Sequence, residues 1–253
     1  MHSLRADVKR FSYSISFIIS ILLAFALLFR PLLTNWITWG FRGIATDAMT
    51  LLSEPLALSS FTPFAVLFCA LPYSISFCED YNSGYMRIII VRIGKFRYIT
   101  NRIISVMFSG ILAMGIPIAT IVLFCVIGAT QPITQDTLDW LPRNWIPYAQ
   151  YMGGLWMFLL RILLAMLFGA VWSLMALFIS TIIPNRYVTL IGPFVIYQAM
   201  WALLPESQWN PLYQLRADFE GLPSIWFSFA YQVCLTCILV FASALGMMRR
   251  ILK

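Results

Sequence analysis

The chain has 253 residues, of which 61% are hydrophobic and only 11% are charged, and its mean hydropathy is +0.84. Charged residues this sparse cannot cover the surface of a soluble protein of this length, which excludes that class and indicates an integral membrane protein. The net charge of +7 gives no support for nucleic-acid binding, because the basic residues follow the expected membrane topology and do not gather on a soluble face.

Six apolar runs are long enough to cross a hydrocarbon core of roughly 30 Å, which takes about 20 residues in a helix. Unpaired backbone groups are costly in lipid and the runs lack the alternation of a β-barrel, so we expect helices. The predicted fold is all-α, a polytopic membrane protein with a single transmembrane domain over residues 1–253. Its spans are placed at about 11–29, 61–77, 103–128, 155–183, 188–204 and 225–248.

The distribution of charge predicts the orientation, because Lys and Arg are retained on the cytoplasmic side. With the N-terminus inside, the inner segments hold 12 of the 17 basic residues and three of the ten acidic ones, a net +9. The outer segments hold five basic and seven acidic residues, a net −2. Both termini and segment 78–101 are therefore predicted to be cytoplasmic.

The first residues of the chain mix apolar and basic side chains. Residues 1–10 are predicted either to lie on the inner leaflet or only to fix the orientation of the first span. The first run is too long for the core of a signal peptide, and Arg30-Pro31 offers no cleavage site, so we expect a retained span. In the second run Pro63 and Pro72 predict a bent helix, which is either a lever or a tolerated kink.

Residues 77–101 are the most highly charged stretch of the chain. Asp80 and Ser83 are good N-cap residues, and Gly94 is suited to a left-handed helix end. This pattern predicts a helix from about Ser83 to Arg92.

Tyr81, Tyr85 and Ile88 are spaced three or four residues apart, which places them on one helical face. Such a face could enter a groove on a soluble partner. The alternative is a plain cytoplasmic loop whose charge only sets the topology.

Arg161 lies about two turns into the fourth span and is the clearest ionisable residue at membrane depth. A buried Arg is costly in lipid, so it marks either a translocation path or subunit interface, or a side chain that snorkels to the headgroups. All five cysteines fall in or at the ends of spans, so no disulfide framework is expected. Cys234 and Cys237 form a C-x-x-C that we interpret as packing.

The sequence lacks the residues that several classes of membrane enzyme and transporter require. The single histidine, His2, excludes H-E-x-x-H metalloproteases and serine nucleophiles with a His partner, and no aspartate lies within a span. No G-x-x-x-x-G-K-[ST] phosphate loop occurs, and the near absence of carboxylates from the spans argues against an ion-coupled carrier. We therefore expect no catalytic residue, no metal site and no cofactor in this chain, and we expect energy to come from a separate subunit.

The sequence E-D-Y-N-S-G-Y-M-R at 79–87, followed by R-I-G-K-F-R-Y-I at 92–99 and then span three, resembles the permease subunits of type-2 ABC exporters. In that family the corresponding segment is a coupling helix that docks into the ATPase subunit. The resemblance implies an ATPase-docking surface at Glu79, Asp80, Tyr81, Gly84, Tyr85 and Arg87. It also implies a lipid boundary at Arg92, Lys95 and Arg97.

The resemblance further implies a homodimer or a heterodimer with a second permease, in a bacterial plasma membrane. ATP and magnesium would bind the partner ATPase, and the substrate exported would be hydrophobic or amphipathic, such as a peptide, a bacteriocin or a drug-like molecule. The alternative is a membrane assembly factor or sensor that transports nothing and binds a cytoplasmic partner through the same helix. No residue names a substrate.

Overall fold

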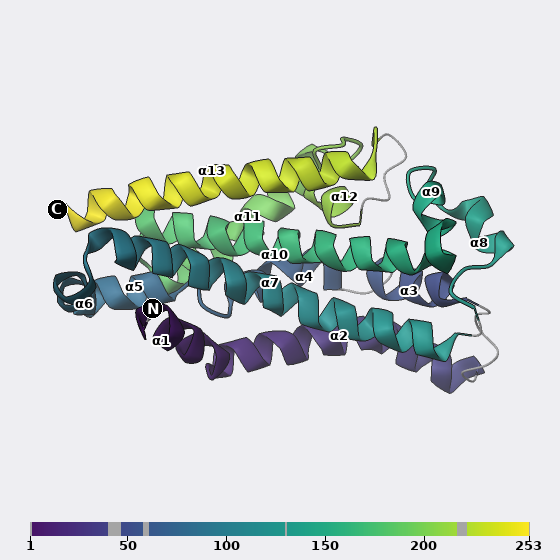
Figure 1. The fold of residues 1–253 in the computed structure, drawn as a ribbon, viewed down its shortest axis with the longest axis horizontal. Helices are drawn as coiled ribbons and strands as arrows, with labels where there is room; N and C mark the ends of the chain where they lie inside the picture. The colour runs from purple at the N-terminus through teal and green to yellow at the C-terminus, as the bar shows by residue number, and fades with distance from the viewer. Residues whose placement is uncertain (1, 40–46, 58–60, 130, 217–221, 253) are drawn as a thin grey trace.

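The computed structural model describes residues 2–39, 47–57, 61–129, 131–216 and 222–252. Their helices form an elongated bundle, with the long helices running along its longest axis (Figure 1). No β-strand occurs among the described residues, which form only one isolated bridge, between Asp47 and Gln131. The helices are α1 (His2–Ser12), α2 (Ile15–Trp39), α3 (Ala48–Ala57), α4 (Phe61–Ala70), α5 (Ser76–Asn82), α6 (Tyr85–Ile93), α7 (Lys95–Gly128), α8 (Gln135–Trp140), α9 (Ile146–Ala149), the 3-10 helix η1 (Tyr151–Gly154), α10 (Leu155–Ile182), α11 (Arg186–Leu203), α12 (Pro211–Arg216) and α13 (Ile225–Ile251).

Four helices of the described part are long and apolar enough to cross a membrane. They are Ile15–Thr34 within α2, and the whole of α7, α10 and α13. They correspond to the first, third, fourth and sixth predicted spans, so a helical fold compatible with a multi-pass membrane protein is confirmed. The six-span layout stays a prediction.

The second predicted span, 61–77, is broken in the structure. It consists of α4, a turn over residues 71–75, and the start of α5. Pro63 lies in the first turn of α4, where its missing N–H costs nothing, whereas Pro72 lies in the turn, where the chain leaves the helix. The fifth predicted span appears as α11, which has 18 residues with Pro193 inside it and is not among the four candidate spans.

The centre of the bundle is the contact between α7 and α10. A Cβ atom added to Gly110 would lie 2.4 Å from the carbonyl oxygen of Gly169, so no larger residue fits at this crossing. Small residues of this kind let helices in membranes approach closely. By contrast α2 and α13 expose apolar side chains outward, for example Leu22 and Phe241, as helices in contact with lipid do.

Both chain termini lie at one end of the bundle, together with α1, α5 and α6 (Figure 1). We call this the terminal end. The opposite end carries α3, α8 and α9, and we call it the distal end. The segment predicted to be cytoplasmic thus shares an end with both termini, while the assignment of that end to the cytoplasm rests on the charge count.

Candidate functional site at the terminal end

Two glycines set the path of the charged segment. Gly84 has φ +71° and separates α5 from α6, while Gly94 has φ +84° and separates α6 from α7. Positive φ costs glycine little, because it has no Cβ. The helix expected from about Ser83 to Arg92 is therefore present as α6. Gly94 has a positive φ, but its ψ of 154° differs from the left-handed helix end expected there. Figure 1 shows α6 turned across the bundle axis at the terminal end.

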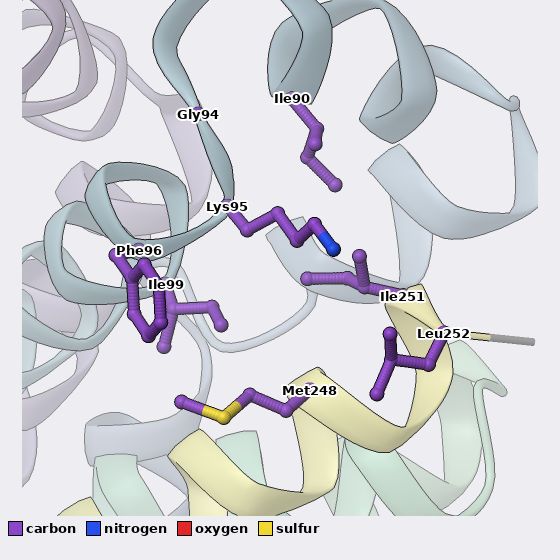
Figure 2. Close-up of a pocket in the computed structure, with 8 residues that line it drawn as sticks. All are labelled: Ile90, Gly94, Lys95, Phe96, Ile99, Met248, Ile251 and Leu252. Atoms are coloured by element: carbon purple, nitrogen blue, oxygen red, sulfur yellow. The ribbon is translucent and has the colours of Figure 1, made fainter.

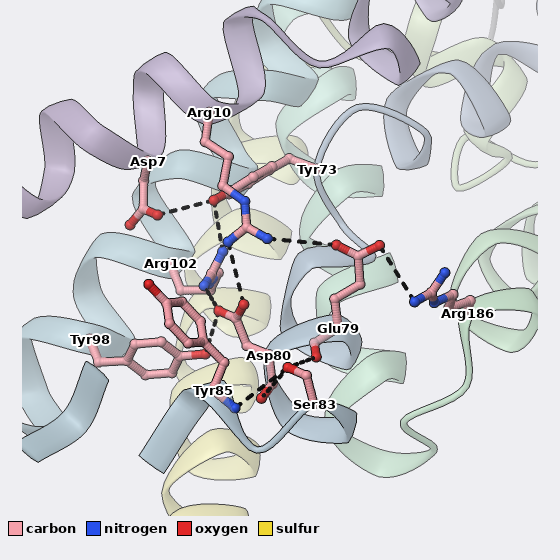
Figure 3. Close-up of polar contacts among 10 residues, drawn as sticks. All are labelled: Asp7, Arg10, Tyr73, Glu79, Asp80, Ser83, Tyr85, Tyr98, Arg102 and Arg186. Atoms are coloured by element: carbon pink, nitrogen blue, oxygen red, sulfur yellow. Dashed lines mark hydrogen bonds and ion pairs between the residues drawn. The ribbon is translucent and has the colours of Figure 1, made fainter. Parts of the chain in front are cut away.

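Ser83 and Asp80 differ in the roles that their side chains take. The Ser83 hydroxyl accepts a hydrogen bond from the Tyr85 backbone N–H at 3.4 Å and donates one to the Glu79 carbonyl at 2.6 Å. It therefore helps to close the corner between α5 and α6. Asp80 does not cap this helix, because its carboxylate turns inward to partners on α7 and α1 (Figure 3).

The centre of the site is a buried ion pair between Asp80 on α5 and Arg102 on α7, and both side chains are 1% exposed. Tyr98 donates a hydrogen bond to Asp80 Oδ2 at 3.3 Å, and Arg102 donates one to the Tyr73 hydroxyl at 2.8 Å. The guanidinium carbon also lies 5.3 Å from the ring centroids of both tyrosines. These hydrogen bonds and ring contacts offset the cost of removing two charges from water.

Helix α1 closes the site from the N-terminal side. Arg10 donates a hydrogen bond to Asp80 Oδ1 at 3.4 Å, and Asp7 accepts one from the Tyr73 hydroxyl at 3.0 Å. Phe11, which is buried, packs its ring 5.9 Å from that of Tyr73. Among the residues predicted to lie on a leaflet or only to fix orientation, Asp7 and Arg10 thus bond to the bundle, although neither side chain is buried.

Glu79 extends the charges to the surface. Its carboxylate lies 3.8 Å from Arg10 and 3.9 Å from Arg186 at the start of α11, and all three side chains are partly exposed. We call the whole set the polar cluster, and Figure 3 shows its members: Asp7, Arg10, Tyr73, Glu79, Asp80, Tyr98, Arg102 and Arg186.

The polar cluster has no net charge, since three acidic residues face three arginines. Its three acids are all of those that the charge count assigns to the inner side. Among the described residues, no ion pair is formed by the other basic residues of the terminal end, namely Lys9, Arg87, Arg92, Lys95, Arg97 and Arg249. The surface of this end is therefore positive.

Helix α5 also holds the junction of α10 and α11. The Asn82 side-chain amide donates a hydrogen bond to the carbonyl of Pro184, in the turn between these helices, at 3.1 Å. The Cys78 sulfur and the Thr189 hydroxyl on α11 are hydrogen-bonded at 3.1 Å. Burial raises the pKa of the Cys78 thiol, so this side chain is a neutral packing group.

Tyr81 connects α5 to α13. The Arg250 guanidinium carbon lies 5.6 Å from the centroid of the Tyr81 ring, and its Nε donates a hydrogen bond to the Thr181 carbonyl on α10 at 2.9 Å. Helix α5 is thus attached through named side chains to α1, α7, α11 and α13, which all come together at the terminal end.

The six residues predicted to dock an ATPase differ in their exposure. Gly84, Tyr85 and Arg87 are exposed, Glu79 and Tyr81 are partly exposed, and Asp80 is buried. Contact of the Asp80 side chain with a partner would therefore require the ion pair to open. Tyr81 lies on α5 while Tyr85 and Ile88 lie on α6, so the three do not share one helix as expected. The predicted lipid-boundary residues Arg92, Lys95 and Arg97 are all exposed. Docking and boundary roles stay predictions.

Arg161 lies near the distal end and contacts protein. Its guanidinium carbon is 4.5 Å from the ring centroid of Trp145, which is fully buried just before α9, and Arg161 itself is 8% exposed. A snorkelling side chain would expose its charged group, so this cation–π contact replaces that interpretation. A role at a translocation path or interface stays a prediction.

Cys234 and Cys237, which we interpreted as packing residues, are exposed on α13. Among the residues that the structure describes, no group of three or more His, Cys, Asp or Glu side chains could hold a metal ion.

Comparisons with protein-family models, with curated proteins and with solved structures find no match to this chain. The sequence did not reveal the partners of Asp80, namely Arg102, Tyr98 and Arg10. One signal was present: Asp7, Glu79 and Asp80 are the only acids among many bases on the predicted inner side, so each has a cation available as a partner.

Proposed function

We propose that this chain is the transmembrane permease subunit of an ATP-driven exporter of the type-2 ABC class. A separate ATPase subunit docks on segment 79–92, and the terminal end faces the cytoplasm of a bacterium. The observation that carries the proposal is the position of α5 and α6. Helix α6 lies exposed across the end of the bundle, and α5, joined to it at Gly84, is attached to four other helices.

This arrangement suits the transmission of a partner's movement. A displacement of α6 moves α5 directly, because only Ser83 and Gly84 lie between them. The Asp80–Arg102 pair then carries the displacement to α7, and the contacts of Tyr81 carry it to α13. Packed helices respond to such shifts by moving as units, since close-packed interiors deform little.

The apolar character of the spans supports the proposed substrate class. Their outward faces and their mutual contacts are apolar, and the candidate spans bury few ionisable groups. A hydrophobic or amphipathic molecule, such as a peptide or a drug-like compound, is therefore the proposed cargo. It would move between this chain and a second permease, identical or not. ATP and magnesium would bind the ATPase.

The test uses the tagged full chain, isolated from its native membrane with its bound partners. Wild type is expected to retain an ATPase with a phosphate-loop motif and to hydrolyse ATP in proteoliposomes. The variant Tyr85→Ala with Ile88→Asp removes the exposed face of α6. It is expected to lose at least about tenfold in ATPase retention, as loss of central interface side chains does.

The control is Tyr151→Ala, which removes an exposed aromatic ring at the distal end. It is expected to retain the ATPase. If no ATP-hydrolysing subunit accompanies the wild-type chain, the exporter proposal is wrong. A partner without ATPase activity that is lost only from the α6 variant would then support the assembly factor or sensor.

A further inference from the structure

A hollow of about 500 Å³ lies between α6, the start of α7 and the end of α13 (Figure 2). Its walls are almost entirely apolar and include Ile90, Ile99, Met248, Ile251 and Leu252. The volume lies within the range of about 300–1,000 Å³ that is typical of ligand pockets. Figure 2 shows the Lys95 side chain extending across the hollow, with its amine toward Ile90 and Ile251.

A second hollow of about 650 Å³ lies directly beside the first and shares Ile90 and Ile251 with it. Its lining is mainly polar and includes Asn82, Arg87 and Arg250. An apolar compartment thus adjoins a cationic one across two shared side chains. This is the arrangement that an amphiphile with an acyl chain and an anionic headgroup requires.

The charges around both hollows have one sign. Among the residues that the structure describes, no acidic residue lines either hollow, because Glu79 and Asp80 are turned into the polar cluster. Among the described residues, Lys95 and Arg87 form no ion pair, so both charges are available to a ligand.

The hollows also lie at the ends of candidate membrane spans. They are formed where two candidate spans, α7 and α13, reach the terminal end, and the neighbouring Val91 and Phe96 are exposed apolar side chains. Apolar and basic side chains alternate at the boundary between headgroups and hydrocarbon. Basic pockets between membrane helices on the cytoplasmic side are suited to lipid phosphates.

We propose that this paired hollow binds one anionic phospholipid of the leaflet at the terminal end. An acyl chain occupies the apolar compartment, and the phosphate lies between Lys95 and Arg87. The bound lipid joins the α6–α7 corner to the end of α13. This inference does not depend on an ATPase partner, so it can hold where the exporter proposal fails.

The test reconstitutes the full chain in vesicles of phosphatidylcholine with a minor fraction of phosphatidylglycerol that carries a photoreactive acyl chain. Cross-links are mapped by mass spectrometry and are expected on the apolar wall, around Ile90 and Ile251. Phosphatidylcholine with the same photoreactive chain, at the same fraction, is expected to label these positions much less.

The variant Lys95→Gln is expected to lower labelling by phosphatidylglycerol about tenfold, since a hydrogen bond to a charged phosphate contributes more than general attraction to an anionic surface. Arg97→Gln is the matched control: Arg97 is exposed and basic on the same turn of α7 but does not line the hollow. It is expected to lower labelling clearly less than Lys95→Gln does, because it removes only general attraction to the anionic surface. A second variant, Ile251→Trp, fills the apolar wall and is expected to reduce labelling without a change in charge.

Equal labelling by the two lipids, or equal losses in Lys95→Gln and Arg97→Gln, would mean general attraction to the surface and would overturn the proposal. Cross-links from this wall to a second protein chain in place of lipid would overturn it as well. They would assign the hollow to a protein partner.

Discussion

Two buried carboxylates lie at opposite ends of the bundle, and different groups stabilise them. Asp80 at the terminal end faces a cation, Arg102. Asp47 at the distal end, also 1% exposed, accepts hydrogen bonds from neutral donors in the described part of the chain. These are the backbone N–H groups of Thr50 and Thr134, both at 3.1 Å, and the hydroxyls of Thr134 at 3.3 Å and Thr137.

The two arrangements suit different tasks. The bonds of Asp47 reach α3, which it directly precedes, and the start of α8, so they join two neighbouring segments of the distal end. The bonds of Asp80 reach α7 and α1 and continue through Arg10 to the surface. The hydrogen bonds of Asp47 therefore hold only neighbouring segments together, whereas the polar cluster connects the exposed α6 corner to the long helices.

The largest expected effect tests the charged character of the terminal pair. Asp80→Asn leaves Arg102 buried without a counter-charge, which costs about 3–5 kcal/mol of stability. Adding Arg102→Met removes the orphaned charge, so the double variant is expected to recover most of this loss. Unfolding of the purified protein in detergent measures both. If the losses of unfolding free energy from the two single substitutions add in the double variant, Asp80 and Arg102 are not energetically coupled. The contrast drawn between the two ends would then be wrong.

The second-largest expected effect tests the hydrogen bonds of Asp47 at the distal end. Asp47→Ala removes the acceptor for the Thr50 and Thr134 N–H groups, and we expect a loss of about 2 kcal/mol. Asp47→Asn keeps one acceptor oxygen and is expected to cost less. Unfolding in detergent is again the measurement. Because Asp47→Ala leaves no buried cation without a partner, its loss of stability should be smaller than that of Asp80→Asn. A larger loss would mean that the hydrogen bonds of Asp47 contribute more to stability than the ion pair of Asp80.

Hydropathy predicted the long helices well, because each of α2, α7, α10 and α13 contains a long apolar stretch. It did not predict the break after α4, since the run from 61 to 77 stays apolar through the turn. Hydropathy depends only on the composition of a segment, whereas the end of this helix depends on the backbone restrictions of Pro72.

One corner residue of the site, Gly94, was predictable, since it acts through its own backbone, whereas the corner at Gly84 was not predicted. The ion pair was not, because Asp80 and Arg102 are 22 residues apart on different helices. Charge counting assigned Arg102 to topology alone. The structure places it about two turns inside α7, where its side chain is 1% exposed and an unpaired charge would be costly.

The dependence of stability on pH gives a further test of the site at Asp47. Burial raises the pKa of Asp47, but hydrogen bonds from Thr137, Thr50 and Thr134 outweigh it and hold that pKa below its ordinary value of 3.8. A lowered folded-state pKa gives stability that is fully present above the unfolded-state value and is lost as pH falls through the folded-state value.

The difference in unfolding free energy between wild type and Asp47→Asn is therefore expected to be constant from neutral pH to about pH 4, and to shrink below it. Unfolding in detergent at a series of pH values measures this difference. A difference that grows on acidification would contradict the assignment.

The smallest effect lies within the polar cluster itself. Arg10 reaches Asp80 at 3.4 Å and Glu79 at 3.8 Å, but its side chain is 46% exposed. Exposed pairs of this kind are worth about 0.2–1 kcal/mol and weaken with added salt. Arg10→Ala is therefore expected to cost less than 1 kcal/mol, with a loss that disappears at about 1 M salt. Phe11, buried beside it, keeps α1 in place in this variant.

A cost as large as that of Asp80→Asn would mean that the buried pair depends on α1. The N-terminal helix would then be part of the connection between α6 and the bundle, and its removal would uncouple the two.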